Sequence, residues 1–123
     1  MSGATYDTGM LIALERRKPR AMAIHERLFE RAIPITTPWV VVVEFWNGRT
    51  DRREAILRSV DVEPPSIALA KSAGEALTAV RAGLADAIVM ASAAQRGDVV
   101  YTSDLGDLSV LQRRFPNVRL LTI

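Results

Sequence analysis

Short apolar runs alternate with longer amphipathic segments along the chain. The runs predict strands over residues 3–7, 33–36, 60–63, 99–102 and 118–122. The segments between them predict helices over residues 8–15, 19–32, 51–59, 66–80, 85–95 and 108–114. Strands that alternate with helices are typical of a parallel sheet with helices on both faces. We therefore predict one α/β domain over residues 1–123, a three-layer α/β/α fold with a central, mostly parallel five-stranded sheet.

The segment TPWVVVVEFWNG is ambiguous. Four consecutive valines favour a strand by local preference. Thr37-Pro38, however, is a helix-start signal with Pro at the first helical position, and Asn47-Gly48 is a plausible end. We favour a helix, with the valines on its buried side.

Composition indicates a globular domain with its own core, since 49% of the residues are hydrophobic and 24% are charged. The chain has no cysteine, no apolar run long enough to cross a membrane and no visible signal peptide, so we expect a cytoplasmic protein. Only Lys18 and Lys71 among the 16 basic residues are lysine. The arginines reflect either a GC-rich genome or phosphate binding, so a nucleic-acid partner is permitted.

Four acids stand in apolar or small-residue sequence: Asp7, Glu44, Asp86 and Asp104. Ionised carboxylates buried together would repel one another by ~1–4 kcal/mol per pair at about 4 Å, so they call for a divalent cation. Simpler explanations exist for each: Asp7 as a helix cap, Asp86 as a favourable charge at a helix start, Glu44 in a chance ion pair, and Asp104 or Asp107 as turn residues.

The alternation of strands and helices brings these acids to one place. Asp7 ends the first strand, Asp104 follows the fourth, and Asp86 lies in the first turn of its helix. Ligands of open parallel sheets bind beyond the carboxyl ends of the strands. Glu44 joins them only if it projects inward from its helix, which we expect.

The segments YDTGMLIAL, VVVEFWNG and LADAIVMASAAQRGDVVYTSDLGDL, in this order and spacing, resemble a PIN-domain ribonuclease, specifically a VapC-type toxin of a type II toxin–antitoxin system. The resemblance covers essentially the whole chain. It implies that the catalytic, metal-binding acids are Asp7, Glu44, Asp86 and Asp104. It implies auxiliary positions at Thr8, Thr102 and Asp107. The family's fourth motif varies between members, which leaves open whether Asp104 or Asp107 approaches the metal; we favour Asp104, with Asp107 in the outer shell.

Such a site implies Mg²⁺-dependent hydrolysis of RNA phosphodiester bonds, with Mn²⁺ as a possible substitute, because oxygen ligands suit these ions better than zinc. His25, the single histidine, is expected on the solvated surface, which disfavours His-based ribonuclease chemistry. Arginines at the cleft rim would hold RNA phosphates; the candidates are Arg16, Arg17, Arg49 and Arg81.

The resemblance also implies a cognate VapB-like antitoxin and a homodimer. Leu11, Leu14 and the helix over residues 19–32 are possible contacts, although core packing explains the apolar members better. Trp39 and Trp46, seven residues apart, are expected on one helix side in the core or an interface. The alternative function is a catalytically inactive PIN-like module for binding or scaffolding. A response-regulator receiver is disfavoured because Asp7 has no acidic neighbour.

Overall fold

Five strands form one parallel sheet at the centre of the computed structural model, which describes residues 3–48 and 51–123. The strands are β1 (Ala4–Tyr6), β2 (Ile35–Pro38), β3 (Asp61–Glu63), β4 (Val99–Thr102) and β5 (Arg119–Thr122). Their order is β3-β2-β1-β4-β5, and every neighbouring pair is parallel. The chain therefore leaves β1 toward one side of the sheet and returns to its other side, which places the switch point in strand order at the end of β1.

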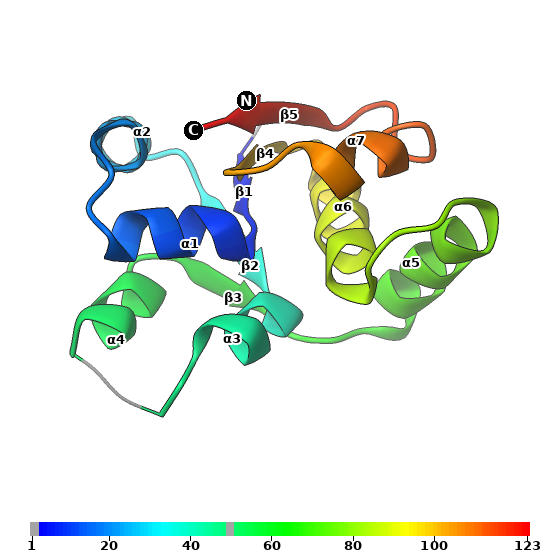
Figure 1. The fold of residues 1–123 in the computed structure, drawn as a ribbon, viewed down its shortest axis with the longest axis horizontal. Helices are drawn as coiled ribbons and strands as arrows, with labels where there is room; N and C mark the ends of the chain where they lie inside the picture. Colours follow the sequence, from blue (N-terminus) through cyan, green and yellow to red (C-terminus); the bar gives the residue numbers. More distant parts are fainter. Residues whose placement is uncertain (1–2, 49–50) are drawn as a thin grey trace.

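Helices cover both faces of this sheet. They are α1 (Thr8–Glu15), α2 (Pro19–Glu30), α3 (Trp39–Phe45), α4 (Asp51–Arg58), α5 (Ile67–Ala79), α6 (Leu84–Arg96) and α7 (Gly106–Leu111). In Figure 1, α1, α2 and α4 lie to the left of the strands, and α5, α6 and α7 lie to the right. The three-layer α/β/α fold is thus confirmed. No helix in the described ranges is long and apolar enough to cross a membrane.

The core lies on both faces of β1 and β4, where α1 and α6 pack on the sheet. Leu11 and Leu14 of α1 are buried, which agrees with core packing and leaves neither free for a partner. Every residue of α6 from Ala87 to Ala93 is buried. This buried segment packs on β1 and β4, and the first turn of α6 lies at the edge of the sheet where the cavity forms.

The valine segment is a helix, as favoured, but its boundaries differ from the prediction. β2 extends to Pro38, and α3 runs only from Trp39 to Phe45. Val40 and Val41 are buried, whereas Val43 is 69% exposed, so the valines do not form one buried side. Trp46 follows the helix in an extended conformation (φ −75°, ψ 130°), so the expected shared helix side of Trp39 and Trp46 is wrong.

The last helix also begins earlier than predicted. α7 spans Gly106–Leu111 rather than 108–114. The Asp104 carboxylate accepts the Gly106 amide at 2.9 Å, which satisfies a free donor near the helix start. The chain after Leu111 forms turns, so Arg113 and Arg114 lie outside the helix.

Candidate active site

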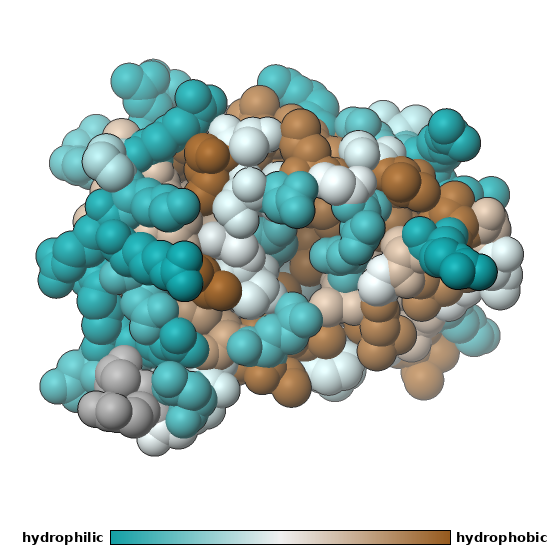
Figure 2. Space-filling model, in the orientation of Figure 1, coloured by the Kyte–Doolittle hydropathy of each residue, from teal (hydrophilic) through white to brown (hydrophobic). Residues whose placement is uncertain are grey.

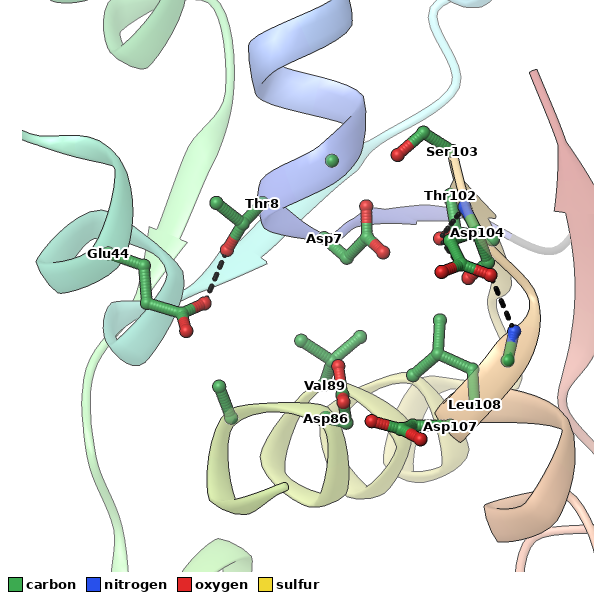
Figure 3. Close-up of a pocket in the computed structure, with 13 residues that line it drawn as sticks. Asp7, Thr8, Glu44, Asp86, Val89, Thr102, Ser103, Asp104, Asp107 and Leu108 are labelled. Carbon is green, nitrogen blue, oxygen red and sulfur yellow. Dashed lines mark hydrogen bonds between the residues drawn. The ribbon is translucent and has the colours of Figure 1, made fainter. Parts of the chain in front are cut away.

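The seven candidate residues line one cavity of about 240 Å³ at the carboxyl ends of the central strands (Figure 3). It is formed by the starts of α1, α6 and α7, by α3 and by the loop after β4. Its lining residues are Asp7, Thr8, Gly9, Glu44, Ala85, Asp86, Val89, Thr102, Ser103, Asp104, Gly106, Asp107 and Leu108. The sequence therefore predicted which acids the fold brings together; their roles stay predictions.

Asp7 lies between β1 and α1, at the switch point in strand order. Its side chain is buried and caps α1 by accepting the Met10 amide at 2.9 Å. Capping and site membership, which the sequence treats as alternatives, therefore coexist in this residue. Burial raises the pKa of Asp7, and the nearby Glu44 carboxylate adds to the effect, while the Thr102 hydroxyl and the Met10 amide oppose it.

Glu44 reaches the cavity from α3 as an exposed side chain, not as the inward-projecting acid expected from the sequence. Its carboxylate accepts the Thr8 hydroxyl at 2.5 Å, so α3 is joined to the start of α1 (Figure 3). The sequence predicted that all four acids are buried, and among them only Asp7 is buried. Asp86 is half-buried and Asp104 is exposed. The acids share an open pocket instead of a closed interior.

Asp86 carries the largest electrostatic perturbation among the acids. It stands in the first turn of α6, half-buried, and its pKa is raised to about 6, with burial as the largest cause. Repulsion by Asp107, Asp7 and Glu44, in that order, contributes further. A carboxylate with such neighbours favours either a proton or a cation, which is typical of functional sites.

The two acids of the TSDLGDL segment have different surroundings. The Asp104 side chain accepts the Gly106 amide, and the Thr102 hydroxyl donates to the Asp104 carbonyl at 2.8 Å and accepts its amide at 3.0 Å. Asp107, in the first turn of α7, instead lies next to Asp86 in the cavity (Figure 3). Asp104 is thus held by its own turn, whereas Asp107 is the charged neighbour with the largest effect on the pKa of Asp86.

Six lining residues were not predicted from the sequence: Gly9, Ala85, Val89, Ser103, Gly106 and Leu108. Gly9 and Ser103 are a closely packed pair among them. A Cβ added at Gly9 would lie 2.2 Å from Ser103 Oγ and 3.2 Å from Ser103 Cβ. Only glycine therefore lets the first turn of α1 approach the loop after β4 this closely. Their positions beside Thr8 and Thr102, in the TG and TS pairs, are the only sequence signal that could have identified them.

The donor set suits a divalent cation bound through oxygen. Five carboxylates line the cavity, and none of its 13 lining residues is basic. Within residues 3–48 and 51–123, no three acidic or histidine side chains already surround one point as a metal would require. Mg²⁺ keeps several of its waters in proteins, so a loosely spaced carboxylate set fits it through one or two direct ligands.

His25 does not lie on the solvated surface, contrary to the prediction. It is half-buried on α2, its Nδ1 is 2.9 Å from the Tyr6 hydroxyl, and burial lowers its pKa. The rings of His25 and Tyr6 also contact each other, with centroids 5.7 Å apart. His25 is absent from the cavity lining, so the expectation that it takes no part in the chemistry still stands as a prediction.

Arg16, Arg17 and Arg81, the candidate arginines that the structure describes, do not line the cavity either. Arg16 and Arg17 follow the end of α1, whereas the cavity lies at its start. Arg81 is exposed in the loop between α5 and α6. Arg49 lies outside the described residues. The rim positions expected for Arg16 and Arg17 are therefore wrong.

The chain is a three-layer α/β/α domain with an acidic pocket at the carboxyl edge of its parallel sheet, an arrangement suited to metal-assisted chemistry. The family profile described as PIN domain matches residues 5–111, and the chain therefore belongs to the PIN domain family.

Solved structures share the fold over nearly the whole chain. VapBC2 from Rickettsia felis, bound to a promoter DNA fragment, is 15% identical with a TM-score of 0.75 and 98% of each chain covered. A toxin–antitoxin complex from Klebsiella pneumoniae is 20% identical with a TM-score of 0.75, covering 98% of this chain and 100% of that one. VapBC-5 of the VapBC family of toxin–antitoxin systems, from Mycobacterium tuberculosis, is 23% identical with a TM-score of 0.62 and full coverage of both chains. No curated protein sequence matches the chain significantly.

Proposed function

We propose that this chain is a Mg²⁺-dependent endoribonuclease, the VapC-type toxin of a toxin–antitoxin pair. The observation that carries the proposal is the pocket of five carboxylates without a basic lining residue, in a PIN domain. The likeness to VapBC structures supports the toxin assignment. Mn²⁺ would substitute for Mg²⁺, since both prefer oxygen ligands.

Asp7, Asp86 and Glu44 would hold the ion, with Asp104 and Asp107 completing the set. When bound, Mg²⁺ supplies charge stabilisation at the phosphate and lowers the pKa of a coordinated water. The chain's own contribution is orientation. The Met10 amide fixes the Asp7 carboxylate, the Thr8 hydroxyl fixes that of Glu44, and the Gly106 amide fixes that of Asp104.

Asp107 is proposed to act on Asp86 through charge. Burial first, and repulsion by Asp107 second, raise the pKa of Asp86 to about 6, so that Asp86 would readily exchange a proton for a cation. We therefore propose that Asp107 lies nearer the ion than the outer-shell position that we favoured from the sequence. Substitution by Asn at Asp107 and at Asp104 would rank the two acids by their effect on metal affinity.

A covering partner is also part of the proposal. Two apolar side chains that adjoin lining residues in the sequence are well exposed: Val43 (69%), next to Glu44, and Leu84 (65%), next to Ala85. Exposed apolar groups gathered near a site favour association with another protein surface. They support the proposed homodimer and VapB-like antitoxin, which light scattering of the pure chain and of a co-expressed pair would test.

RNA cleavage by the wild type and by Asp7→Asn, each with Mg²⁺ and with a chelator, tests the activity. We expect cleavage only by the wild type with Mg²⁺. Asp61→Asn, which changes an exposed acid on β3 outside the cavity, is the matched control and should cleave normally. Cleavage that survives chelation, or equal cleavage by Asp7→Asn, would refute the metal-nuclease proposal. Antitoxin binding without cleavage by the wild type would instead support the inactive binding module.

A further inference from the structure

A basic turn joins α1 to α2 at the end of α1 remote from the acidic cavity. We define the basic turn as residues 16–20, which contain Arg16, Arg17, Lys18 and Arg20 around Pro19. All four cations are exposed, and among the described residues none of them lies within 4.0 Å of a carboxylate oxygen. Four cations in five positions thus face solvent without a partner ion.

Two nearby arginines of α4, Arg52 and Arg53, differ from the cations of the basic turn because they form hydrogen bonds or ion pairs within the fold. Arg52 donates to the carbonyls of Leu14 and Glu15, and Arg53 binds the Glu15 carboxylate, with one contact at 2.9 Å. Glu15 is the acid next to the turn, and Arg53 already neutralises it. Arg16 is near enough to help lower the pKa of Glu15, after the larger effect of Arg53, but no cation of the basic turn forms an ion pair within 4.0 Å among the described residues.

The backbone of the turn is fixed, which matters for binding. Arg17 has a φ of 56°, a conformation that is unfavourable for any residue with a Cβ. The Arg17 amide donates to the Leu14 carbonyl at 3.1 Å, and the Lys18 amide donates to the Ala13 carbonyl at 3.0 Å. Pro19 then fixes the entry to α2. A preorganised array of cations loses less entropy on binding than a mobile one.

The start of α2 adds to this positive field. α2 has no side-chain cap and no acidic residue in its first turn, so its amide groups contribute positive partial charge beside Lys18 and Arg20. Apolar side chains are absent from the turn apart from Pro19. Charge without apolar anchors favours a solvated polyanion over a lipid surface or an apolar protein face.

The basic turn and the cavity are connected along α1. The eight residues of α1 span about 12 Å, from Thr8 at the cavity to Glu15 at the turn. Thr8, Ile12 and Arg16 are four residues apart on one side of the helix and are all at least partly exposed. Figure 2 shows hydrophilic side chains gathered at the left of the molecule, where Figure 1 places the α1–α2 turn.

We propose that the basic turn binds backbone phosphates of the substrate RNA strand away from the bond that is cut. One strand carries a phosphate about every 3.4 Å along a stacked helix. The turn would thus contact phosphates roughly three or four nucleotides from the cavity. This inference rests on the proposed ribonuclease function. It explains how a substrate can be held although the cavity is lined by negative charge.

Matched charge-removal variants test the proposal. The first variant carries Arg16→Gln, Arg17→Gln and Arg20→Gln. The control carries Arg113→Gln, Arg114→Gln and Arg119→Gln, which removes three exposed arginines near β5. Asp7→Asn is added to both variants and to their parent so that RNA is not cut. Binding of a labelled single-stranded oligonucleotide is then measured by fluorescence anisotropy across a salt series.

We expect the turn variant to bind at least about tenfold more weakly at low salt, and its log–log salt slope to flatten by about 2. The control should stay close to the parent. Equal losses in the two variants would overturn the proposal, because net charge alone would then explain binding. Salt-dependent binding to anionic vesicles, lost only in the turn variant while RNA binding is retained, would also overturn it.

Arg17→Gly guards against misfolding of the triple variant. Glycine suits the positive φ at this position, so we expect a melting temperature at least equal to that of the wild type together with weaker RNA binding. Unchanged RNA binding by a stable Arg17→Gly, together with an unchanged salt slope, would count against the proposal.

Cleavage assays without Asp7→Asn separate this inference from the proposed function. A dinucleotide is too short to reach the turn, so the turn variant should cleave it as the wild type does, while its cleavage of longer RNA should show a raised KM. Normal cleavage of long RNA by the turn variant would refute the inference alone. Failure of the wild type to cleave any RNA with Mg²⁺ would refute the proposed function.

Discussion

Gly9→Ala is the sharpest test of how the cavity is built. The new Cβ would lie 2.2 Å from Ser103 Oγ, 3.2 Å from Ser103 Cβ and 3.3 Å from the Ser103 backbone nitrogen. Rotation about the Ser103 Cα–Cβ bond moves Oγ and relieves the first contact only. The remaining two force the start of α1 away from the loop after β4, so Asp7 and Asp104 move apart.

The expected magnitude comes from comparison with a second glycine. Gly74 is exposed within α5, and a Cβ there would meet nothing within 4 Å. Gly74→Ala should therefore stabilise the fold by about 0.5–1 kcal/mol through helix propensity alone. Gly9→Ala gains the same propensity but adds an overpacking cost of about 1–3 kcal/mol. The free energies of unfolding of the two variants should differ by that amount.

Urea denaturation followed by circular dichroism measures both free energies, and RNA cleavage reports the site. Gly9→Ala should lose activity, whereas Gly74→Ala should retain it. Ser103→Gly, added to Gly9→Ala, removes the clashing side chain and should recover at least about 1 kcal/mol in a double-mutant cycle. If Gly9→Ala is as stabilising as Gly74→Ala, the close approach of α1 and the loop is refuted.

Three further predictions concern charge. The Arg96 side chain is 28% exposed and forms ion pairs with Glu63 at 2.9 Å and Asp98 at 2.8 Å. Arg96→Met should therefore lower the free energy of unfolding, measured in urea, by about 2–3 kcal/mol. A loss near zero would contradict a structural role for Arg96. The pKa of Asp86 is raised to about 6, so ionisation of this carboxyl lowers the stability of the fold as the pH rises through that value. Without metal, Asp86→Asn should therefore flatten the pH dependence of the melting temperature between about pH 4 and 7. A pH profile identical to that of the wild type would contradict this prediction. Arg53 lies over the Phe45 ring at 4.7 Å and donates to the Phe45 carbonyl, so Arg53→Met should disturb the adjacent Glu44. We expect calorimetry to show Mn²⁺ binding weakened about tenfold in this variant. Arg58→Met, which removes an exposed arginine of the same helix, should leave Mn²⁺ binding unchanged.

Much of the fold follows from local sequence. Apolar runs bounded by Pro, Asn or Gly predict the strands near their observed positions, and helix-start signals predict the valine segment as a helix. The boundaries were wrong where a single contact decides them. The bond between the Asp104 carboxylate and the Gly106 amide starts α7 earlier than the apolar pattern indicates.

The candidate site was predictable because it depends on topology. In a parallel sheet every strand ends at the same edge, so Asp7 after β1 and Asp104 after β4 must come close whatever the details of packing. The burial of individual acids was not predictable. Glu44 is exposed because the Thr8 hydroxyl holds it at the open side of the cavity, and no pattern within the valine segment encodes that contact.

The sequence by itself determined the alternation of strands and helices, and with it the edge of the sheet at which the acids meet. Only the tertiary structure decided that Asp107 opposes Asp86, that Gly9 must lack a side chain beside Ser103, and that His25 pairs with Tyr6. The physical reason is the range of each interaction. Hydrophobic periodicity and capping act within a few residues and can be read locally, whereas these contacts join segments brought together only when α1, α2, α6 and α7 pack on the sheet.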